Sequence, residues 1–211
     1  MFDFVMDGYA TISAFLIFAS PSVWNTLGHL EYNSGKISAL FKGNKENGYR
    51  LVMFIIIFMQ IIRNVFYYLA CIYSVPMFPA IDNFMNSVPI VMDCLAYPLF
   101  IAGWVLSLSS FMRLGFKGTY EGDCFGFLFD EMITKFPFDG TVPHPMYTGG
   151  AMLFFSSALH YRTSTGLILS IFSVMVYVVF SYLVEQPYTE QIYANKDKAD
   201  KAKRMSSKKE E

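Results

Sequence analysis

The chain has 211 residues and a formal net charge of −1, and 54% of its residues are hydrophobic, 18% aromatic and only 16% charged. A mean hydropathy of +0.37 is high for a soluble domain and typical of a polytopic membrane protein. The balanced charge argues against nucleic acid as a partner, and the length leaves no room for a separate soluble catalytic domain. We therefore expect an all-α, polytopic integral membrane bundle with about four to five membrane-embedded helices.

Three apolar runs are long enough to cross a hydrocarbon core of about 30 Å as helices. They cover residues 51–75, 88–112 and 167–184. Two shorter runs leave spanning and re-entrant or interfacial positions open: residues 9–20, which stop at Pro21, and residues 149–161, which stop at Arg162. We expect 149–161 to pair with 167–184 as a helical hairpin that turns at 162–166. Trp24 suits an interfacial anchor after the first run.

Lys and Arg gather in segments 36–50 and 113–135 and in the tail after Ala194, whereas the connection 74–87 contains neither. If the hairpin returns the chain, the positive-inside rule puts these basic segments in the cytosol and 74–87 on the other side of the membrane. We divide the chain into a membrane domain, residues 1–194, and a charged, disordered cytosolic tail, residues 195–211. The last residues, Lys208-Lys209-Glu210-Glu211, match a dilysine signal for retrieval to the endoplasmic reticulum, and an ordinary charged tail is the alternative.

The three cysteines, Cys71, Cys94 and Cys124, are odd in number and lack the spacing of metal ligands. We expect them to be packing thiols, and we expect no metal site. The common sequence motifs of hydrolases, zinc proteases and P-loop proteins do not occur.

Four residues with reactive side chains lie at the edges of apolar segments: Asp123, His144, Tyr147 and Glu185. An ionisable group is costly there unless it has a function or a partner. Taken singly, each has a plain structural explanation, but their grouping at one predicted membrane face favours a reaction site. Residues 147–150, read as the start of a helix, offer N–H groups for a carboxylate or phosphate, and Glu185 offers a counter-charge for a cation. A ligand with both charges, such as S-adenosylmethionine, suits this combination.

Several blocks of sequence, in order, resemble the phospholipid N-methyltransferases of the endoplasmic reticulum, over nearly the whole chain. The blocks are residues 21–25 (PSVWN) followed by Glu31, 114–126 (LGFKGTYEGDCFG), 136–138 (FPF), 145–149 (PMYTG), 165–167 (TGL) and 185–193 (EQPYTEQIY). The resemblance implies that residues 1–194 form a methyltransferase domain. It also implies S-adenosylmethionine-dependent N-methylation of phosphatidyl-N-methylethanolamine in phosphatidylcholine synthesis. Phosphatidylethanolamine and phosphatidyl-N,N-dimethylethanolamine stay open as further acceptors.

The resemblance also implies where the methyl donor binds, with two departures from the family pattern. The family's Gly-x-Gly falls on Ile101, Ala102 and Gly103, where isoleucine replaces the first glycine. Its Glu-Glu falls on Glu185 and Gln186, where an amide replaces the second acid.

The residue before Pro-Met-Tyr is a further departure, because the family usually has asparagine where this chain has His144. The His-Pro-x-Tyr pattern is closer to the isoprenylcysteine carboxyl methyltransferases, a related membrane group. Methylation of a prenylated cysteine is therefore one alternative, and a non-enzymatic lipid-binding or scaffold protein is another. The sequence specifies neither the oligomeric state nor the number of methyl groups on the preferred acceptor.

We assign catalysis to His144, Asp123 and Tyr147. The amine must lose a proton, and His144, Asp123 and Glu185 are the possible bases. Histidine is the side chain among them that most readily exchanges a proton near neutral pH. Aromatic side chains are expected to contact the methylated ammonium by cation–π attraction, namely Tyr120, Tyr147 and Tyr188.

Overall fold

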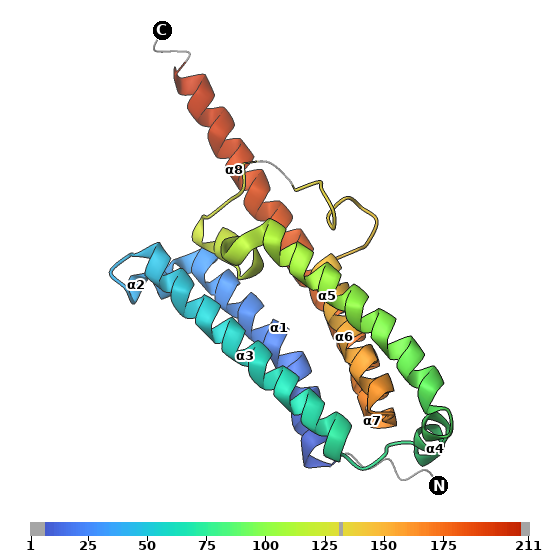
Figure 1. The fold of residues 1–211 in the computed structure, drawn as a ribbon. Helices are drawn as coiled ribbons and strands as arrows, with labels where there is room; N and C mark the ends of the chain where they lie inside the picture. The colour runs from blue at the N-terminus through green and yellow to red at the C-terminus, as the bar shows by residue number, and fades with distance from the viewer. Residues whose placement is uncertain (1–6, 131–132, 208–211) are drawn as a thin grey trace.

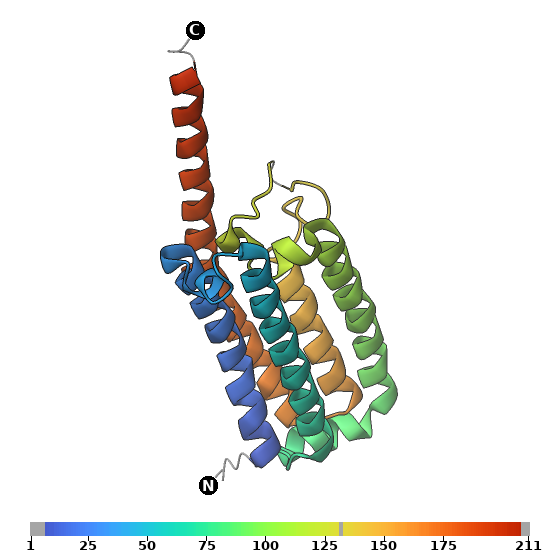
Figure 2. The ribbon, with the colours of Figure 1, turned by 90° about the vertical axis from the view of Figure 1, so that its left-hand side faces the viewer.

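The computed structural model describes residues 7–130 and 133–207, and all regular secondary structure there is helical. The long helices are α1 (Gly8–Ser34), α3 (Lys45–Tyr73), α5 (Pro89–Thr119), α6 (Pro145–His160), α7 (Ser164–Phe180) and α8 (Gln186–Ser207). The short elements are α2 (Lys36–Ala39), α4 (Pro79–Ser87), the 3₁₀ turn η1 (Gly122–Phe125) and the π turn η2 (Ser181–Glu185). Helices α1, α3, α5, α6 and α7 lie side by side in one bundle, and α8 continues α7 beyond it (Figures 1 and 2). The predicted all-α bundle is confirmed.

Four helices among the described residues are long and apolar enough to cross a membrane: Gly8–Ser34, Lys45–Tyr73, Pro89–Phe125 and the one that begins at Ser164. Helix α6 has 16 residues and so extends for about 24 Å. It is the shortest of the bundle helices, yet it runs antiparallel to its neighbours α5 and α7 between the same two ends (Figure 1). The chain is a multi-pass membrane protein in which α6 and α7 form the expected hairpin, turning between His160 and Ser164.

The first apolar run does not stop at Pro21, as expected, but continues as α1 to Ser34. Proline removes one backbone N–H and usually breaks a helix. Here Ser20 Oγ donates to the Leu16 carbonyl at 2.7 Å and Asn25 Nδ2 donates to the Pro21 carbonyl at 2.9 Å. Membrane helices tolerate proline more readily than soluble ones do, and α1 stays helical through Pro21. Trp24 is consequently buried inside the bundle, and its predicted role as an interfacial anchor is wrong.

Helix α5 extends beyond the expected end at residue 112 and bends sharply at Gly115. Its φ of 61° and ψ of −170° are outside the helical range and open to glycine because it lacks a Cβ. The bend carries the chain into η1, which packs against α1, α3 and α5. Phe125 of η1 is 1% exposed and meets the Tyr49 ring edge-on at 5.9 Å. This apolar anchor fixes η1, and with it Glu121 and Asp123, at the end of the bundle.

The middle of the bundle is held by one buried tyrosine. The Tyr67 hydroxyl, on α3, lies 2.6 Å from the Phe154 carbonyl of α6 and 2.8 Å from Ser170 Oγ of α7. Its ring stacks on the Phe154 ring with centroids 4.0 Å apart. A buried hydroxyl with partners on two other helices fixes their relative height, because losing these hydrogen bonds inside an apolar core is costly.

The two ends of the bundle differ in charge. Segments 36–50, 113–135 and 196–209 contain every Lys and Arg of the chain except Arg63 and Arg162. The described parts of these segments lie at the end that holds α2, η1 and the start of α8, which we call the basic end (Figures 1 and 2). The grouping that the hairpin was expected to produce is therefore present.

The opposite end is closed by two acids that hold the α6–α7 turn. Asp82 of α4 accepts a hydrogen bond from the Ser164 N–H at 2.8 Å, and Asp93 of α5 accepts one from Arg162 at the same distance. Asp82 thereby satisfies one of the unpaired N–H groups at the start of α7. The connection 74–87 thus contains a short helix, α4, that is docked on the bundle.

The end of the chain departs from the predicted disordered tail as far as the structure describes it. Residues 195–207 continue α8 as a helix. Alternating Lys, Ala and Asp residues favour helix in this stretch even without a packing partner. Lys208 and Lys209 lie outside the described residues, and the boundary at residue 194 stays a prediction.

Candidate active site at the basic end

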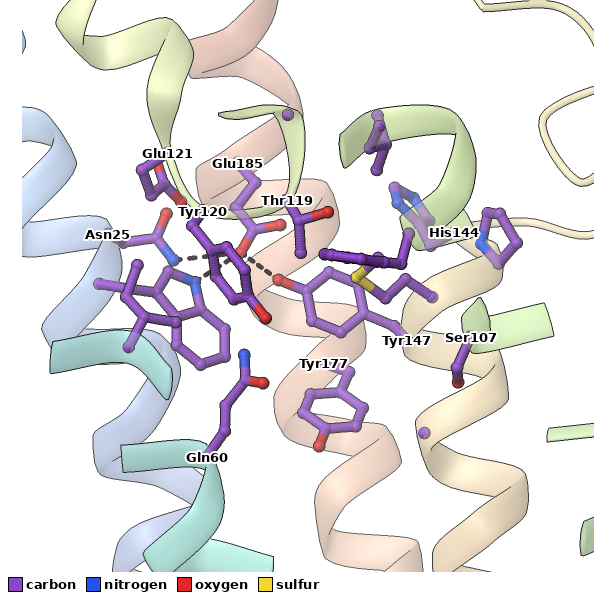
Figure 3. A pocket seen from close by; sticks show the side chains of 18 of the residues that line it. Asn25, Gln60, Ser107, Thr119, Tyr120, Glu121, His144, Tyr147, Tyr177 and Glu185 are labelled. Carbon is purple, nitrogen blue, oxygen red and sulfur yellow. Dashed lines mark hydrogen bonds between the residues drawn. The ribbon is translucent and has the colours of Figure 1, made fainter. Parts of the chain in front are cut away.

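Glu185 is the centre of the site, because side chains from two other helices converge on its carboxylate. Its Oε1 accepts hydrogen bonds from Trp24 Nε1 at 3.0 Å, from Asn25 Nδ2 at 3.2 Å and from the Tyr147 hydroxyl (Figure 3). The donors come from α1 and α6, more than 35 residues away in the sequence. All three are neutral, so they orient the carboxylate without balancing its charge.

The local structure around Glu185 is a π turn, η2, between α7 and α8. Single π turns inside helices are rare and occur often at functional sites, since they shift the register of the side chains that follow. Tyr147 is placed by the first turn of α6, which begins at Pro145. Proline suits the first helical position because its missing N–H would be unpaired there anyway.

Two more acids, Glu121 and Asp123, share the cavity with Glu185. Glu121 has a left-handed backbone with φ of 57°, a conformation that costs energy for a residue with a side chain. Its Oε2 lies 3.3 Å from Cys124 Sγ and packs against Gly28 of α1. Asp123 Oδ1 accepts the Cys124 N–H at 2.9 Å.

These three acids have no cationic partner among residues 7–130 and 133–207, where the ion pairs instead involve Glu46, Asp93 and Asp130. An unbalanced group of carboxylates at the edge of a membrane bundle favours a positively charged ligand. By distance alone Glu121, Asp123 and Cys124, with ligand atoms within 4.8 Å of one another, could also hold a metal ion. An organic cation suits the cavity better, because aromatic rings line it.

The cavity has a volume of about 540 Å³, within the size range of small-molecule sites. It lies between α1, α3, α5, α6 and α7 and is closed at the basic end by η1 and the start of α8. The predicted aromatic contacts Tyr120, Tyr147 and Tyr188 all line it. Predicted reactive residues from three separate parts of the sequence therefore meet in one space: Asp123, His144, Tyr147 and Glu185.

His144 occupies the residue before α6 and has a left-handed backbone with φ of 42°. Its ring meets the Tyr182 ring edge-on with centroids 4.5 Å apart. In Figure 3 it lies on the far side of Tyr147 from Glu185. The cavity therefore has an acidic wall and, across Tyr147, a wall with an imidazole.

The residues onto which the family's Gly-x-Gly falls lie outside the cavity lining. Ile101 is 63% exposed on the outside of α5. Gly103 is buried against α6, where an added Cβ would lie 2.9 Å from the Gly149 carbonyl oxygen. Ala102 does not line the cavity, whereas Trp104 of the following turn does. A donor-binding role for residues 101–103 stays a prediction, and in this geometry their contribution is the close contact of α5 with α6.

The two residues onto which the family's Glu-Glu falls, Glu185 and Gln186, face different surroundings. Glu185 faces the cavity, but Gln186 is exposed and its amide donates to Glu190 at 3.0 Å. Neighbours in a helix are about 100° apart around its axis, so one residue of a pair can face inward and the next outward.

The expectation that residues 147–150 open a helix with free N–H groups is wrong. Helix α6 begins at Pro145, and the Thr148 N–H already donates to the His144 carbonyl at 3.0 Å. Gly149 serves a different purpose, since its added Cβ would lie 2.6 Å from Ser107 Oγ of α5.

Sequence reasoning missed four residues of the site. Trp24 and Asn25 belong to the matching block 21–25, but their role depended on α1 continuing past Pro21. Glu121 lies two residues before Asp123, and the glycines on either side of residues 119–121 were the available signal of unusual backbone. Arg63 was also passed over, as a lone charge within an apolar run.

Comparison with known proteins agrees with this geometry. The family model described as phospholipid methyltransferase matches residues 91–196. The chain belongs to the phospholipid methyltransferase family. Of the cavity's elements, the match includes most of α5 and all of η1, α6 and α7, and it reaches Glu185.

Relatives from distant organisms cover most of the chain. It is similar to phosphatidylethanolamine N-methyltransferase A of Dictyostelium discoideum, 36% identical over 85% of this chain and 78% of that protein. The phosphatidyl-N-methylethanolamine N-methyltransferase of Schizosaccharomyces pombe is 34% identical over 82% of this chain and 85% of its own length. The human phosphatidylethanolamine N-methyltransferase is 31% identical over 80% of this chain and 79% of its own length. No solved structure matches the chain.

The protein is therefore a membrane-embedded methyltransferase whose family acts on phospholipids. Neither a carboxyl methyltransferase nor a scaffold protein is favoured by these relatives. Three family blocks now have structural explanations: 21–25 and 185–193 meet at Glu185, and 114–126 supplies the bend and the acids of η1.

Proposed function

We propose that the protein transfers a methyl group from S-adenosylmethionine to the amine of an ethanolamine phospholipid in phosphatidylcholine synthesis. We further propose phosphatidyl-N-methylethanolamine as the preferred acceptor, with phosphatidylethanolamine and phosphatidyl-N,N-dimethylethanolamine as further acceptors. The relatives are named as methyltransferases of phosphatidylethanolamine or of phosphatidyl-N-methylethanolamine, which supports these two acceptors.

The observation that carries the proposal is the unbalanced negative charge in an aromatic cavity at the end of a membrane bundle. Trp24, Asn25 and Tyr147 hold the Glu185 carboxylate in place by hydrogen bonds. Glu121 and Asp123 add two more acids to the same wall. When bound, S-adenosylmethionine supplies a methyl group on a positively charged sulfur, and the methylated amine is also a cation. The donor and the product are thus both cations, which the acidic side chains of this wall stabilise.

The residues of the chain have three tasks in such a displacement. Glu185 and the acids of η1 provide the counter-charge, and the aromatic rings of Tyr147 and Tyr188 exclude water and contact the cation. The bundle aligns the amine nitrogen with the methyl carbon, which lowers the barrier by holding the two reacting atoms in position.

The third task is to remove one proton from the amine, since only a neutral nitrogen can attack. The proposed bases are His144, which lines the cavity across Tyr147 from Glu185, and Asp123. Tyr147 is proposed to orient Glu185 through its hydroxyl. The base takes the proton from the ammonium nitrogen first; the freed lone pair then forms the new carbon–nitrogen bond while the carbon–sulfur bond breaks and its electron pair goes to sulfur.

We also propose that the protein resides in the endoplasmic reticulum membrane with its basic end in the cytosol. This orientation follows from the Lys and Arg distribution, and it puts the cavity's acids on the side where a soluble methyl donor is available. Lys208 and Lys209 would then form a cytosolic retrieval signal.

The test is an assay of purified protein in lipid nanodiscs with methyl-labelled S-adenosylmethionine. Nanodiscs would contain phosphatidylcholine plus one acceptor carrying zero, one or two N-methyl groups. We expect label in the product lipid and the highest kcat/KM for the acceptor with one methyl group. A protein that binds the donor but labels none of the three lipids would refute the proposal.

A further inference from the structure

Arg63 is a charged residue inside an apolar span. It lies on α3, well within the candidate span Lys45–Tyr73, and only 9% of it is exposed. Its guanidinium lines the same cavity as the acids. An ionised side chain at such a depth is costly, and it usually marks a binding site or an ion pathway.

The structure offers Arg63 no negative charge. Its Nε and Nη2 donate to Asn64 Oδ1 at 3.3 and 3.1 Å, which is a neutral acceptor on the neighbouring residue. Its Cζ lies 5.5 Å from the Phe154 ring centroid and 5.9 Å from that of Tyr177. Within residues 7–130 and 133–207, the ion pairs use other cations. A buried arginine with aromatic neighbours and no acid requires an anion to complete it.

Arg63 lies at a different depth from the acids of the cavity. It sits over Tyr177, and Tyr177 precedes Glu185 by two turns, or about 12 Å of helix. Gln60, one turn nearer the basic end on α3, points toward the acid wall in Figure 3. The cavity is therefore acidic at the basic end and cationic deeper in the bundle. A ligand that carries a positive and a negative group at opposite ends would match this distribution of charge.

The deep part of the cavity borders the outside of the bundle between α3 and α5. Helix α3 packs mainly against α1, and α5 mainly against α6. Lining residues on this side are apolar and partly exposed: Tyr68 is 39%, Trp104 44% and Leu108 51% exposed. An amphiphile bound here can keep its apolar chains in the bilayer while its polar head enters the cavity.

We propose that Arg63, with Gln60 and Asn64 beside it, binds the phosphodiester of the acceptor phospholipid, an inference that rests on the proposed function. Arg63 then fixes the distance of the amine from the methyl donor, because amine and phosphate belong to one short head group. The carboxylate of the donor is the other anion that a guanidinium could hold. The phosphodiester is favoured because Arg63 lies beside the lateral opening, where the lipid's glycerol and acyl chains have their exit.

The experiment compares two acceptors with the same methylated amine and the same diacylglycerol. One is phosphatidyl-N-methylethanolamine, and the other joins the N-methylaminoethyl group to diacylglycerol through an ether oxygen, without phosphate. For Arg63→Gln, kcat/KM should fall at least about tenfold on the phospholipid and less than about threefold on the ether lipid, as expected when a charge-assisted bond to one group is lost. Binding of labelled S-adenosylmethionine to Arg63→Gln should stay within about twofold of wild type, which also shows that the variant folds.

Two further variants complete the test. Arg63→Lys keeps the charge but loses the planar fork, so it should retain part of the preference for the phospholipid. Arg50→Gln, on the same helix but exposed and outside the cavity, should leave both acceptors unchanged.

Three outcomes would overturn the inference. An equal loss on both lipids with weaker donor binding would assign Arg63 to the donor carboxylate. An equal loss of kcat/KM on both lipids with normal donor binding would mean that Arg63 has a structural role. No loss on either lipid would mean that Arg63 does not bind the phosphodiester. If the wild-type protein methylates neither lipid, the proposed function itself fails, which is a separate result.

Discussion

At the scale of single residues, the site depends on charges that the protein leaves unbalanced. Glu185 receives hydrogen bonds from an indole, an amide and a phenol, and none of these donors is a cation. Arg63, deeper in the same cavity, has a neutral amide and two aromatic rings. Burying such a charge without a partner is unfavourable in free energy, and charged groups of the substrates are the partners that offset this cost.

Removing the charge of Glu185 should weaken binding of the methyl donor. Losing a hydrogen bond to a charged group costs roughly 1.5–3 kcal/mol, and 1.4 kcal/mol is a factor of about ten. We therefore expect Glu185→Gln to raise the apparent KM for S-adenosylmethionine at least about tenfold, with little change for the phospholipid. Gln186→Ala is the control, because Gln186 is exposed and already neutral, and it should have a smaller effect. Normal donor binding together with lost turnover would mean that Glu185 is the base or an acceptor contact.

A single methyl group on α1 should disturb the acid wall. A Cβ at Gly28 would lie 2.7 Å from Glu121 Oε2 and 3.0 Å from Cys124 Sγ, so Glu121 must move. We expect Gly28→Ala to lower kcat by about tenfold or more, as small displacements at reacting centres do. Alanine favours helix by about 0.8–1 kcal/mol over glycine, so lower stability is not the expected cause.

Gly8→Ala is the matched control on the same helix, since no atom lies within 4 Å of its added Cβ. Activity should be unchanged in this variant. Equal activity of both variants would show that Glu121 can shift without consequence for the reaction.

At the scale of elements, the contact of α5 with α6 sets the width of the cavity. Gly103 and Gly149 face each other there, and an added Cβ on either would approach the other's carbonyl oxygen to within 2.9 Å. Small residues let membrane helices approach closely, which is the usual basis of such contacts. The turn after Gly103 then carries Trp104 and Ser107 into the lining, and the turn before Gly149 carries Tyr147.

Widening this contact should cost stability. We expect Gly149→Ala to destabilise the protein by about 1–3 kcal/mol, the usual effect of an overpacked contact. Thermal unfolding in detergent measures the difference. Gly150→Ala is the control, because nothing lies within 4 Å of its added Cβ, and it should unfold at or slightly above the wild-type temperature. Equal unfolding temperatures of Gly149→Ala and Gly150→Ala would show that α5 and α6 can move apart without a loss of stability.

The contact of α5 with α6 also allows a test of whether Gly103 acts by packing or by binding the methyl donor, the role that the family pattern assigns to it. If Gly103 acts through packing, Gly103→Ala should lower the unfolding temperature as Gly149→Ala does. Donor affinity would then change no more than in Gly149→Ala. A selective loss of donor binding at normal stability would instead support direct contact with the donor.

At the scale of the whole molecule, charge and topology agree. Segments 36–50 and 113–135 and α8 meet at one end of the bundle, and the connection 74–87, without Lys or Arg, closes the other (Figures 1 and 2). The α6–α7 hairpin makes this possible by returning the chain to the end from which it entered.

The topology predicts which segments meet the glycosylation machinery. A glycan acceptor in a short flexible insertion near Asn83 should be modified, because the positive-inside rule puts 74–87 in the lumen. The same insertion near Gly140 should stay unmodified, and gel mobility before and after glycosidase distinguishes the two. Modification near Gly140 would refute a cytosolic basic end.

The end of the chain carries a separate prediction about location. If Lys208 and Lys209 form a retrieval signal, changing both to Ser should let part of the protein leave the endoplasmic reticulum. The distribution is measured by fluorescence microscopy of protein whose C-terminus is left untagged. The double change Lys198→Ser and Lys201→Ser is the matched control within α8. An unchanged distribution would mean that retention depends on another part of the protein.

The sequence by itself determined the apolar runs, the side of the bundle to which each charged segment belongs, and the family blocks in their order. Hydropathy and charge are sums over neighbouring residues, so they can be read without knowing the fold. The reactive residues could be named for the same reason: Asp123, His144, Tyr147 and Glu185 each stand where an apolar run meets a polar segment.

Only the tertiary structure decided which of these side chains face the cavity and what they contact there. Helix α1 continues across Pro21 and so brings Trp24 to Glu185, 161 residues away in the sequence. Gly103 and Gln186 face away from the cavity although they stand in the family's donor-binding blocks. The depth of Arg63 relative to the acids likewise appears only when α3 and α7 are placed side by side. These features depend on the angle and height of each helix relative to its neighbours, which long-range packing fixes and local sequence does not.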